Sequence, residues 1–265
     1  MATFDPFAEF RMTGHAAIVT GGAQNIGAAI ATSFAGAGAK VMIADLNGDK
    51  AEATAQEIAG KTGGEVLGMG CDVTKDADIA ACVARTAEAF GGVSTLVNNV
   101  GWGRAHPDPL DVSAEDMIES YRLNTLSAMK MTAACRPHLL KAANPTVTNS
   151  GSLVGVLPAF DFIAYSSAKA ALNHMMLGLA HHFARQVRVN TILIGTVLTP
   201  GYADAGLDEK VQHALTHPDN LTGRAGRPED VANAFLWLAS PAGSWVSGQT
   251  LQVAGGGKRV RLIPE

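Results

Sequence analysis

The sequence predicts a single α/β domain built on a doubly wound parallel sheet of about seven strands, with helices on both faces. Short apolar stretches alternate with longer stretches of helical pattern along the whole chain, which is typical of parallel βαβ units. A glycine-rich turn joins the first strand to the first helix. No internal repeat and no break in composition divides residues 1–265, so we expect one domain over the whole chain.

The first part of the chain gives three strand–helix pairs and a fourth strand. Strands are expected where short apolar runs are bounded by turn residues, at residues 15–20, 40–44, 65–70 and 95–98. Helices are expected where alanine and larger apolar residues recur at helical spacing, from the glycine turn to about residue 36, then at 49–60 and 76–90. A loop rich in glycine and proline follows the fourth strand and runs through Pro109.

The remaining elements continue the alternation. One long helix is expected over 113–141, closed near Pro145, and helices follow at 162–183 and at 228–239, where Pro228 suits a first helical turn. The intervening strands are expected at 146–149, 187–194 and 250–253. A loop rich in glycine, proline and aspartate, residues 195–226, is the expected substrate loop, because ligands in such sheets bind beyond the carboxyl ends of the strands.

Composition narrows the class of protein. Hydrophobic residues make up 47% of the chain and charged residues 17%, which allows a large core. The net charge of −4 favours neither nucleic acid nor an anionic membrane as a partner. Residues 1–12 do not resemble a secretory signal, and no apolar run is long enough to span a membrane. The three cysteines show no metal-ligand spacing, and neighbours such as His181 and His182 point apart on a helix, so we expect no metal site. The odd number of cysteines argues against a disulfide framework, so we expect a cytoplasmic protein.

The glycine-rich turn, residues 21–27, predicts a dinucleotide site of the Rossmann type. Such a turn lets the backbone approach a pyrophosphate, and the helix N-terminus behind it offers amide donors. Asp45 ends the second strand, where a carboxylate accepts hydrogen bonds from the adenosine ribose and repels a 2′-phosphate, so we expect NAD. Asp45 could instead cap the following helix. The residues expected to contact NAD here are Gly21, Gln24, Asn25, Ile26, Gly27, Asp45 and Leu46.

Tyr165 and Lys169 lie four residues apart in the predicted helix 162–183, so their side chains share one face. A free tyrosine has a pKa of about 10 and is a poor proton carrier at neutral pH. A fixed ammonium nearby would lower that pKa and suit Tyr165 for general acid–base work on an alcohol or carbonyl. The same spacing also occurs by chance in ordinary helices, so the pair alone does not establish a site.

Six further motifs accompany this pair along the chain. They are Thr20-Gly21-x-x-x-Asn25-x-Gly27, Asp72-Val73, Asn98-Asn99-Val100-Gly101, Asn124, Ser152 and Gly195-x-Val197-x-Thr199. In this order, and over nearly the whole chain, the sequence resembles the short-chain dehydrogenase/reductase family. The resemblance implies an oxidoreductase that interconverts a secondary alcohol and a ketone by hydride transfer with a nicotinamide cofactor, as a homotetramer or homodimer.

The resemblance also implies roles for individual residues. Tyr165 would exchange a proton with the substrate oxygen, Ser152 would hydrogen-bond that oxygen, and Lys169 would lower the pKa of Tyr165 and hold the nicotinamide ribose. Asn124 would position a water that links Lys169 to solvent. Further cofactor contacts implied by the motifs are Asp72, Val73, Asn99, Val197 and Thr199, together with Tyr165 and Lys169.

Four positions depart from the family's motifs. Asn25 replaces the middle glycine of the turn, and asparagine tolerates left-handed backbone better than other residues with a side chain. Val100, Gly151 and Ile194 replace alanine, serine and proline respectively. Asn25 and Val100 add bulk near the cofactor, so the departures bear on cofactor affinity more than on the chemistry.

The substrate is less well defined by the sequence. The segment 153–162 is strongly apolar, which suggests a bulky apolar alcohol or ketone such as a hydroxysteroid, unless half of these residues merely pack in the core. The stretch 240–257 resembles the bacterial 7α-hydroxysteroid dehydrogenases within the family. The alternatives are a 3-oxoacyl thioester reductase, a dehydrogenase of small alcohols or polyols, and a non-catalytic NAD-binding scaffold or redox sensor.

Overall fold

A single parallel sheet forms the centre of the computed structural model, which describes residues 5–199 and 220–256. The strand order among the described residues is β3-β2-β1-β4-β5-β6-β7, and every neighbouring pair is parallel. This confirms the doubly wound sheet of seven strands. The strands are β1 (Ala16–Thr20), β2 (Lys40–Asp45), β3 (Val66–Gly70), β4 (Thr95–Asn98), β5 (Thr146–Ser152), β6 (Arg188–Ile194) and β7 (Thr250–Val253).

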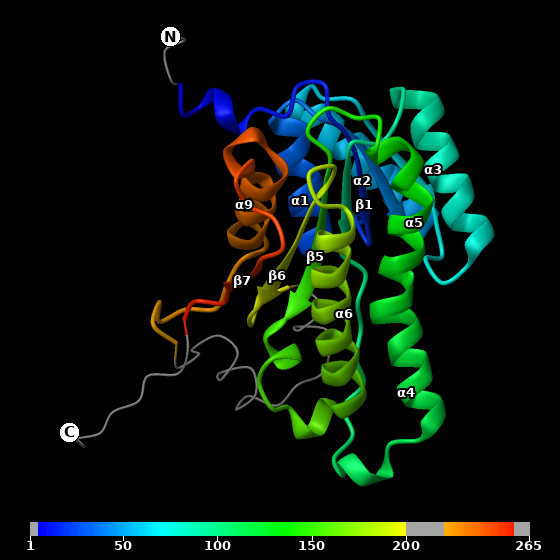
Figure 1. The fold of residues 1–265 in the computed structure, drawn as a ribbon, viewed down its shortest axis with the longest axis vertical. Helices are drawn as coiled ribbons and strands as arrows, with labels where there is room; N and C mark the ends of the chain where they lie inside the picture. Colours follow the sequence, from blue (N-terminus) through cyan, green and yellow to red (C-terminus); the bar gives the residue numbers. More distant parts are fainter. Residues whose placement is uncertain (1–4, 200–219, 257–265) are drawn as a thin grey trace.

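Helices cover both faces of this sheet (Figure 1). One face carries α1 (Asn25–Gly36), α2 (Gly48–Thr62) and α9 (Pro228–Ala239), which bury Phe34 and Phe235 against it. The other carries α3 (Asp76–Phe90), α5 (Ser127–Leu139) and α6 (Ile163–His182), which bury Met131 and Leu172. Short 3₁₀ turns occur at Ala8–Phe10, Pro109–Asp111, Leu153–Gly155, Phe160–Phe162 and Pro241–Gly243.

The long helix predicted over 113–141 is present with one irregular turn. It begins as α4 (Ala114–Tyr121), passes through a π-helical turn at Arg122–Leu126 and continues as α5 to Leu139. Periodicity cannot reveal one extra residue in a single turn, and such π-turns are frequent at functional sites. Asn124 lies inside this turn and is 1% exposed.

Strand β5 is longer than predicted, because it runs to Ser152 and not only to residue 149. Ser150, Gly151 and Ser152 are poor strand formers on their own. They are held in the sheet because β6 pairs with them residue by residue as far as Ser152 opposite Ile194. The predicted loop 195–226 lies partly outside the described residues, since 200–219 are not described.

Arg188 fastens the C-terminal helix to the start of β6. Its guanidinium donates to the carbonyl oxygens of Leu238 (2.6 Å) and Gly243 (2.9 Å), at the end of α9 and in the turn after it. A cation in this position also complements the negative end of the α9 dipole. Burial lowers the pKa of Arg188 from its ordinary value.

Within the described residues, no helix combines the length and apolarity needed to cross a membrane.

Candidate active site

A cleft of about 490 Å³ opens at the carboxyl ends of the strands. It lies beside β1 and β4, the neighbouring strands at which the strand order reverses. Doubly wound folds bind their ligands at this point. Most of the predicted cofactor contacts meet here. The lining residues include Gly21, Gln24, Asn25, Ile26, Gly27, Asp45, Leu46, Asp72, Val73, Asn99 and Thr199, together with Cys71, Val100, Gly101, Trp102 and Leu123.

The glycine turn keeps the shape that a pyrophosphate site needs. Gly21 has a φ of +60°, and a Cβ on Gly27 would lie 2.0 Å from the Gly21 carbonyl oxygen, so this close approach requires glycine. Asn25 has a φ of +53°, which confirms that asparagine takes the left-handed conformation in place of the family's glycine. Among the described residues, no side chain caps the start of α1, which leaves its first-turn amides facing the cleft.

Asp45 joins the end of β2 to the glycine turn. Its carboxylate accepts hydrogen bonds from the backbone amides of Ala23 and Asn47, both at 3.1 Å. The alternative role as a cap of the next helix falls to Asn47, whose side chain accepts from the Lys50 amide at 3.0 Å. Asp45 therefore stands on the cleft wall as a carboxylate, beside the exposed Leu46.

Asp72 and Asn99 shape the adjoining walls. Hydrogen bonds from the hydroxyl (2.7 Å) and amide (3.0 Å) of Thr74 lower the pKa of Asp72 from its ordinary value. The Asn99 side-chain amide donates to the carbonyl oxygens of Thr20 and Gly21, both at 3.1 Å, and so ties the glycine turn to the end of β4. With the glycine cradle, the uncapped helix and a carboxylate at the end of β2, these residues fit a nicotinamide dinucleotide.

Lys169 is almost completely buried, with 2% of its surface exposed. Its ammonium donates to the carbonyl oxygen of Ser150 at 2.9 Å and lies 5.7 Å from the centroid of the Tyr165 ring. Burial lowers the pKa of Lys169 to about 8. The shared helix face predicted for Tyr165 and Lys169 is therefore present, with the lysine beneath the tyrosine.

The backbone of residues 101–103 is the common contact of three predicted catalytic residues. A Cβ on Gly101 would lie 2.7 Å from the Lys169 ammonium and 3.0 Å from the Asn124 carboxamide oxygen. A Cβ on Gly103 would lie 2.6 Å from the Tyr165 side chain. Asn124 accepts from the Trp102 amide (3.1 Å) and donates to the Trp102 carbonyl oxygen (2.9 Å). Asn124 thus holds this segment; its predicted role in a water path stays a prediction.

Ser152 completes the set at the carboxyl end of β5, where it is partly buried. It lies two residues beyond Ser150, whose carbonyl oxygen accepts from Lys169. Tyr165, Lys169 and Val197 are the predicted cofactor contacts that are missing from the described lining of the cleft. Val197 is 6% exposed, pairs through its backbone with Gly226 and belongs to the hydrophobic core.

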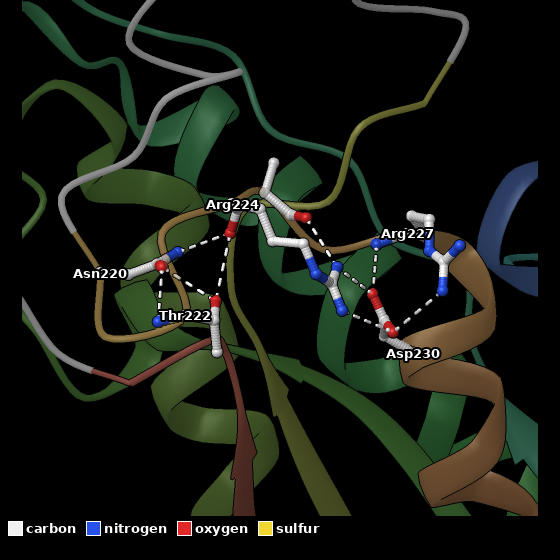
Figure 2. A network of polar contacts seen from close by, with 6 residues as sticks. Asn220, Thr222, Arg224, Arg227 and Asp230 are labelled. Atoms are coloured by element: carbon white, nitrogen blue, oxygen red, sulfur yellow. Dashed lines mark hydrogen bonds and ion pairs between the residues drawn. The ribbon is translucent and has the colours of Figure 1, made fainter.

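The downstream end of the predicted substrate loop is fixed by a polar network (Figure 2). The Asp230 carboxylate accepts from both terminal nitrogens of Arg224, at 2.6 and 3.0 Å, and from the Arg227 amide at 2.8 Å. The hydrogen bonds from Arg224 lower the pKa of Asp230 to about 2. The Thr222 amide also donates to the Gly255 carbonyl oxygen at 3.1 Å, which joins this turn to the end of β7.

Sequence reasoning missed the Ser150 carbonyl and the close approach of Gly103. Every residue has a backbone carbonyl, so the sequence does not show which carbonyl accepts a hydrogen bond. One glycine among several in a loop likewise does not show which side chain packs against it. The described residues also bear on metal binding and on thiol chemistry. No group of three histidine, cysteine, aspartate or glutamate side chains is placed to hold a metal ion there. Cys71, Cys82 and Cys135 are buried free thiols.

Comparison with known proteins agrees with this geometry. A family model described as enoyl-(acyl carrier protein) reductase matches residues 21–258. The 7α-hydroxysteroid dehydrogenase of Escherichia coli K12 is 36% identical over 248 residues, which cover 93% of this chain and 95% of that protein. The 2,5-dichloro-2,5-cyclohexadiene-1,4-diol dehydrogenase of Sphingobium indicum is 38% identical over 253 residues, 93% and 97% of the two chains.

A solved structure of 7α-hydroxysteroid dehydrogenase complexed with NADH and 7-oxo glycochenodeoxycholic acid has the same fold. It superposes with a TM-score of 0.89 at 33% identity and covers 97% of this chain and 98% of that one. Together with the order of the motifs, these similarities establish that the chain belongs to the short-chain dehydrogenase/reductase family and is an oxidoreductase acting on alcohols.

Proposed function

We propose that this protein is an NAD-dependent dehydrogenase that interconverts a secondary alcohol and a ketone on a bulky, largely apolar ring system such as a hydroxysteroid. The observation that carries the substrate class is an exposed apolar surface beside the predicted catalytic residues. Two similar proteins, the hydroxysteroid dehydrogenase and the cyclohexadiene-diol dehydrogenase, carry ring alcohols in their names, which supports the proposal.

The apolar surface comes from segments that flank Ser152 and Tyr165. Val156 and Leu157, shortly after Ser152, are 53% and 55% exposed, and Phe160 is 70% exposed. These side chains are therefore available to a ligand and do not pack in the core. The His106 amide donates to the Asp161 carbonyl oxygen at 2.7 Å, which joins this segment to the loop carrying Trp102, itself 59% exposed. Large exposed apolar side chains close in sequence to the predicted catalytic residues favour an apolar ligand.

The proposed mechanism assigns one task to each catalytic side chain. When bound, a nicotinamide cofactor supplies the acceptor or donor of the hydride. In the oxidation, Tyr165 takes the hydroxyl proton of the substrate, and Ser152 donates a hydrogen bond to the same oxygen. Lys169 lies beneath Tyr165, and its positive charge would favour the phenolate. Asn124 holds the 101–103 backbone against both Tyr165 and Lys169.

The preference for NAD over NADP rests on Asp45. Its carboxylate is fixed on the wall of the cleft by the Ala23 and Asn47 amides. A fixed carboxylate accepts hydrogen bonds from the two ribose hydroxyls of NAD, whereas the 2′-phosphate of NADP would face a like charge. The same argument weighs against a 3-oxoacyl thioester reductase, which usually uses NADPH, although the matching family model is described by an acyl-carrier activity.

The test follows NADH absorbance on a panel of bile acids, other hydroxysteroids, monoterpenols, cyclic alcohols and polyols, with 3-oxoacyl thioesters assayed in reverse. We expect the highest kcat/KM on a ring alcohol. The Tyr165→Phe variant is the control: it should lose about 10²–10⁴-fold in turnover while NADH binding is kept. Activity confined to polyols would refute the apolar substrate, and NADH binding with no turnover of any compound would favour the non-catalytic scaffold.

We also propose that the subunits associate through the helices that carry Asn124 and Tyr165. Ile118, Tyr121 and Met129 on α4 and α5 are 57%, 42% and 39% exposed, and Leu177 on α6 is 41% exposed. In Figure 1 these helices lie side by side on one face of the sheet, and α4 and α6 are in contact. Light scattering at micromolar concentration should give a dimer or tetramer; a monomer would contradict the proposal.

The buried free thiols are compatible with the reducing cytoplasm that we propose as the location.

A further inference from the structure

Asn173 extends the catalytic face of α6 by one more turn. Tyr165, Lys169 and Asn173 are spaced four residues apart on this helix, so their side chains form one row. The first two members have roles in the proposed mechanism, which leaves the third without an explanation. Asn173 is 8% exposed, and among the described residues neither the oxygen nor the nitrogen of its buried carboxamide has a hydrogen-bond partner. Buried amides are rarely left unpaired, because water hydrogen-bonds the same amide in the unfolded chain and folding would lose those hydrogen bonds.

The carboxamide of Asn173 lies between the two glycines that flank Ser152. A Cβ on Gly151 would lie 2.9 Å from the Asn173 oxygen, with Thr191 and Leu193 of β6 at 2.8 and 3.0 Å on its other sides. A Cβ on Gly155 would lie 3.0 Å from the Asn173 nitrogen. Such distances leave no room for a side chain, so the Asn173 carboxamide packs beside the turn that carries Ser152 at both of its glycines.

The same turn is held at a third point. Lys169 donates to the carbonyl oxygen of Ser150, the residue before Gly151. The backbone before Ser152 is therefore fixed to α6 by one hydrogen bond, and Asn173 fills space that side chains at positions 151 and 155 would need. The departure of residue 151 from the family's serine thus has a structural counterpart, because the space of the missing side chain is occupied by Asn173.

We infer that Asn173 is a positioning residue that sets the place of the Ser152 hydroxyl relative to Tyr165. Its carboxamide fills the gap between α6 and the turn at 151–155. This inference rests on the catalytic role proposed for Ser152. Truncation of Asn173 would let the turn settle toward the helix, and a displacement of about 1 Å at a catalytic group lowers the rate by up to about 100-fold.

The test is a double-mutant cycle on the best alcohol of the panel, with NADH formation as the readout. Asn173→Ala should lower kcat about ten- to 100-fold, while the Kd of NADH, measured by fluorescence, stays within about twofold of the wild type. In the Ser152→Ala background the same truncation should change kcat by less than about twofold, because the hydroxyl that it positions is already gone. Asn173→Ser is the second variant, should the alanine protein fail to accumulate, and carries the same expectation.

Met176→Ala is the matched control. Met176 is 1% exposed on the same helix and packs in the core between α6 and the sheet, so its truncation leaves a cavity of similar depth away from Ser152. It should lower the melting temperature and leave kcat unchanged. An equal loss of kcat for Asn173→Ala with and without the Ser152 hydroxyl would overturn the positioning role. If Ser152→Ala alone keeps full activity, the proposed catalytic role of Ser152 has failed instead.

Discussion

Replacing Lys169 by methionine should make the apoprotein more stable at pH 7, although it removes a cation on which the proposed chemistry depends. Lys169 is 2% exposed, and within the described residues the one hydrogen bond of its ammonium goes to the carbonyl oxygen of Ser150. A charge buried with so little compensation destabilises the fold. Methionine keeps the length of the aliphatic chain and carries no charge.

The magnitude follows from the pKa of Lys169. Burial lowers this pKa from 10.5 to about 8. A difference of about 2.5 in pKa corresponds to about 3 kcal/mol, by which the folded state disfavours the charged form. Part of that gain is offset, because the Ser150 carbonyl loses its donor in the variant, so we expect a net stabilisation of about 1–2 kcal/mol at pH 7.

The stability difference between Lys169→Met and the wild type should also depend on pH. Below about pH 8 the lysine is charged in both states and its full cost is present. Between about pH 8 and 10.5 the unfolded chain binds more protons than the folded one, so wild-type stability rises with pH from this group. The advantage of Lys169→Met should therefore shrink across that window. Titrating groups that do not contact Lys169, such as the buried thiols, contribute equally to both proteins and cancel in the difference.

The assay is equilibrium urea unfolding of both proteins at pH 7, 8.5 and 10, at one protomer concentration and without cofactor. A Lys169→Met protein that is less stable than the wild type at pH 7 would refute the reasoning. So would a difference in unfolding free energy that stays constant between pH 7 and pH 10.

Three further changes test other parts of the structure. Asp45→Asn keeps the acceptor for the Ala23 amide and removes the charge, so the ratio of kcat/KM for NAD over NADP should fall at least about tenfold; an unchanged ratio would mean that Asp45 only shapes the turn. Asn25→Ala should raise the Kd of NADH about tenfold, since alanine at a φ of +53° costs about 1–2 kcal/mol, whereas Asn25→Gly should bind as well as the wild type in fluorescence titration. Arg188→Met should lower the unfolding free energy by about 3 kcal/mol, because the carbonyls of Leu238 and Gly243 lose a charged donor; Arg85→Met, in an exposed ion pair, is the control and should change it by less than about 0.5 kcal/mol.

The sequence predicted the order of strands and helices because the sheet is parallel and buried on both faces. Strands such as β1 and β2 are then short apolar runs, distinct from the helices around them. The left-handed conformation of Asn25 could be predicted from the sequence, because asparagine tolerates this conformation at a position where the family has glycine. The cleft lining followed in the same way, since Gly21, Asp45 and Asn99 end or follow strands that meet at one edge.

What the sequence did not predict depends on partners far along the chain. The extension of β5 to Ser152 comes from pairing with β6, which overrides the poor strand propensity of Ser150 and Gly151. The place of Asn173 between Gly151 and Gly155 depends on how α6 packs on the sheet, and periodicity gives only its face, not its neighbours.

Neighbouring residues of the 101–103 segment differ in which substitutions they tolerate. Gly101 and Gly103 cannot change, because Lys169, Asn124 and Tyr165 occupy the space of any side chain there. Trp102 contributes only its amide and carbonyl to Asn124, and every residue except proline can supply both. Its side chain meanwhile faces the cleft and is 59% exposed. If the proposed roles of Tyr165 and Asn124 hold, position 102 is where the side chain can be varied while the backbone that contacts them stays the same, which makes it a starting point for evolving new substrate ranges.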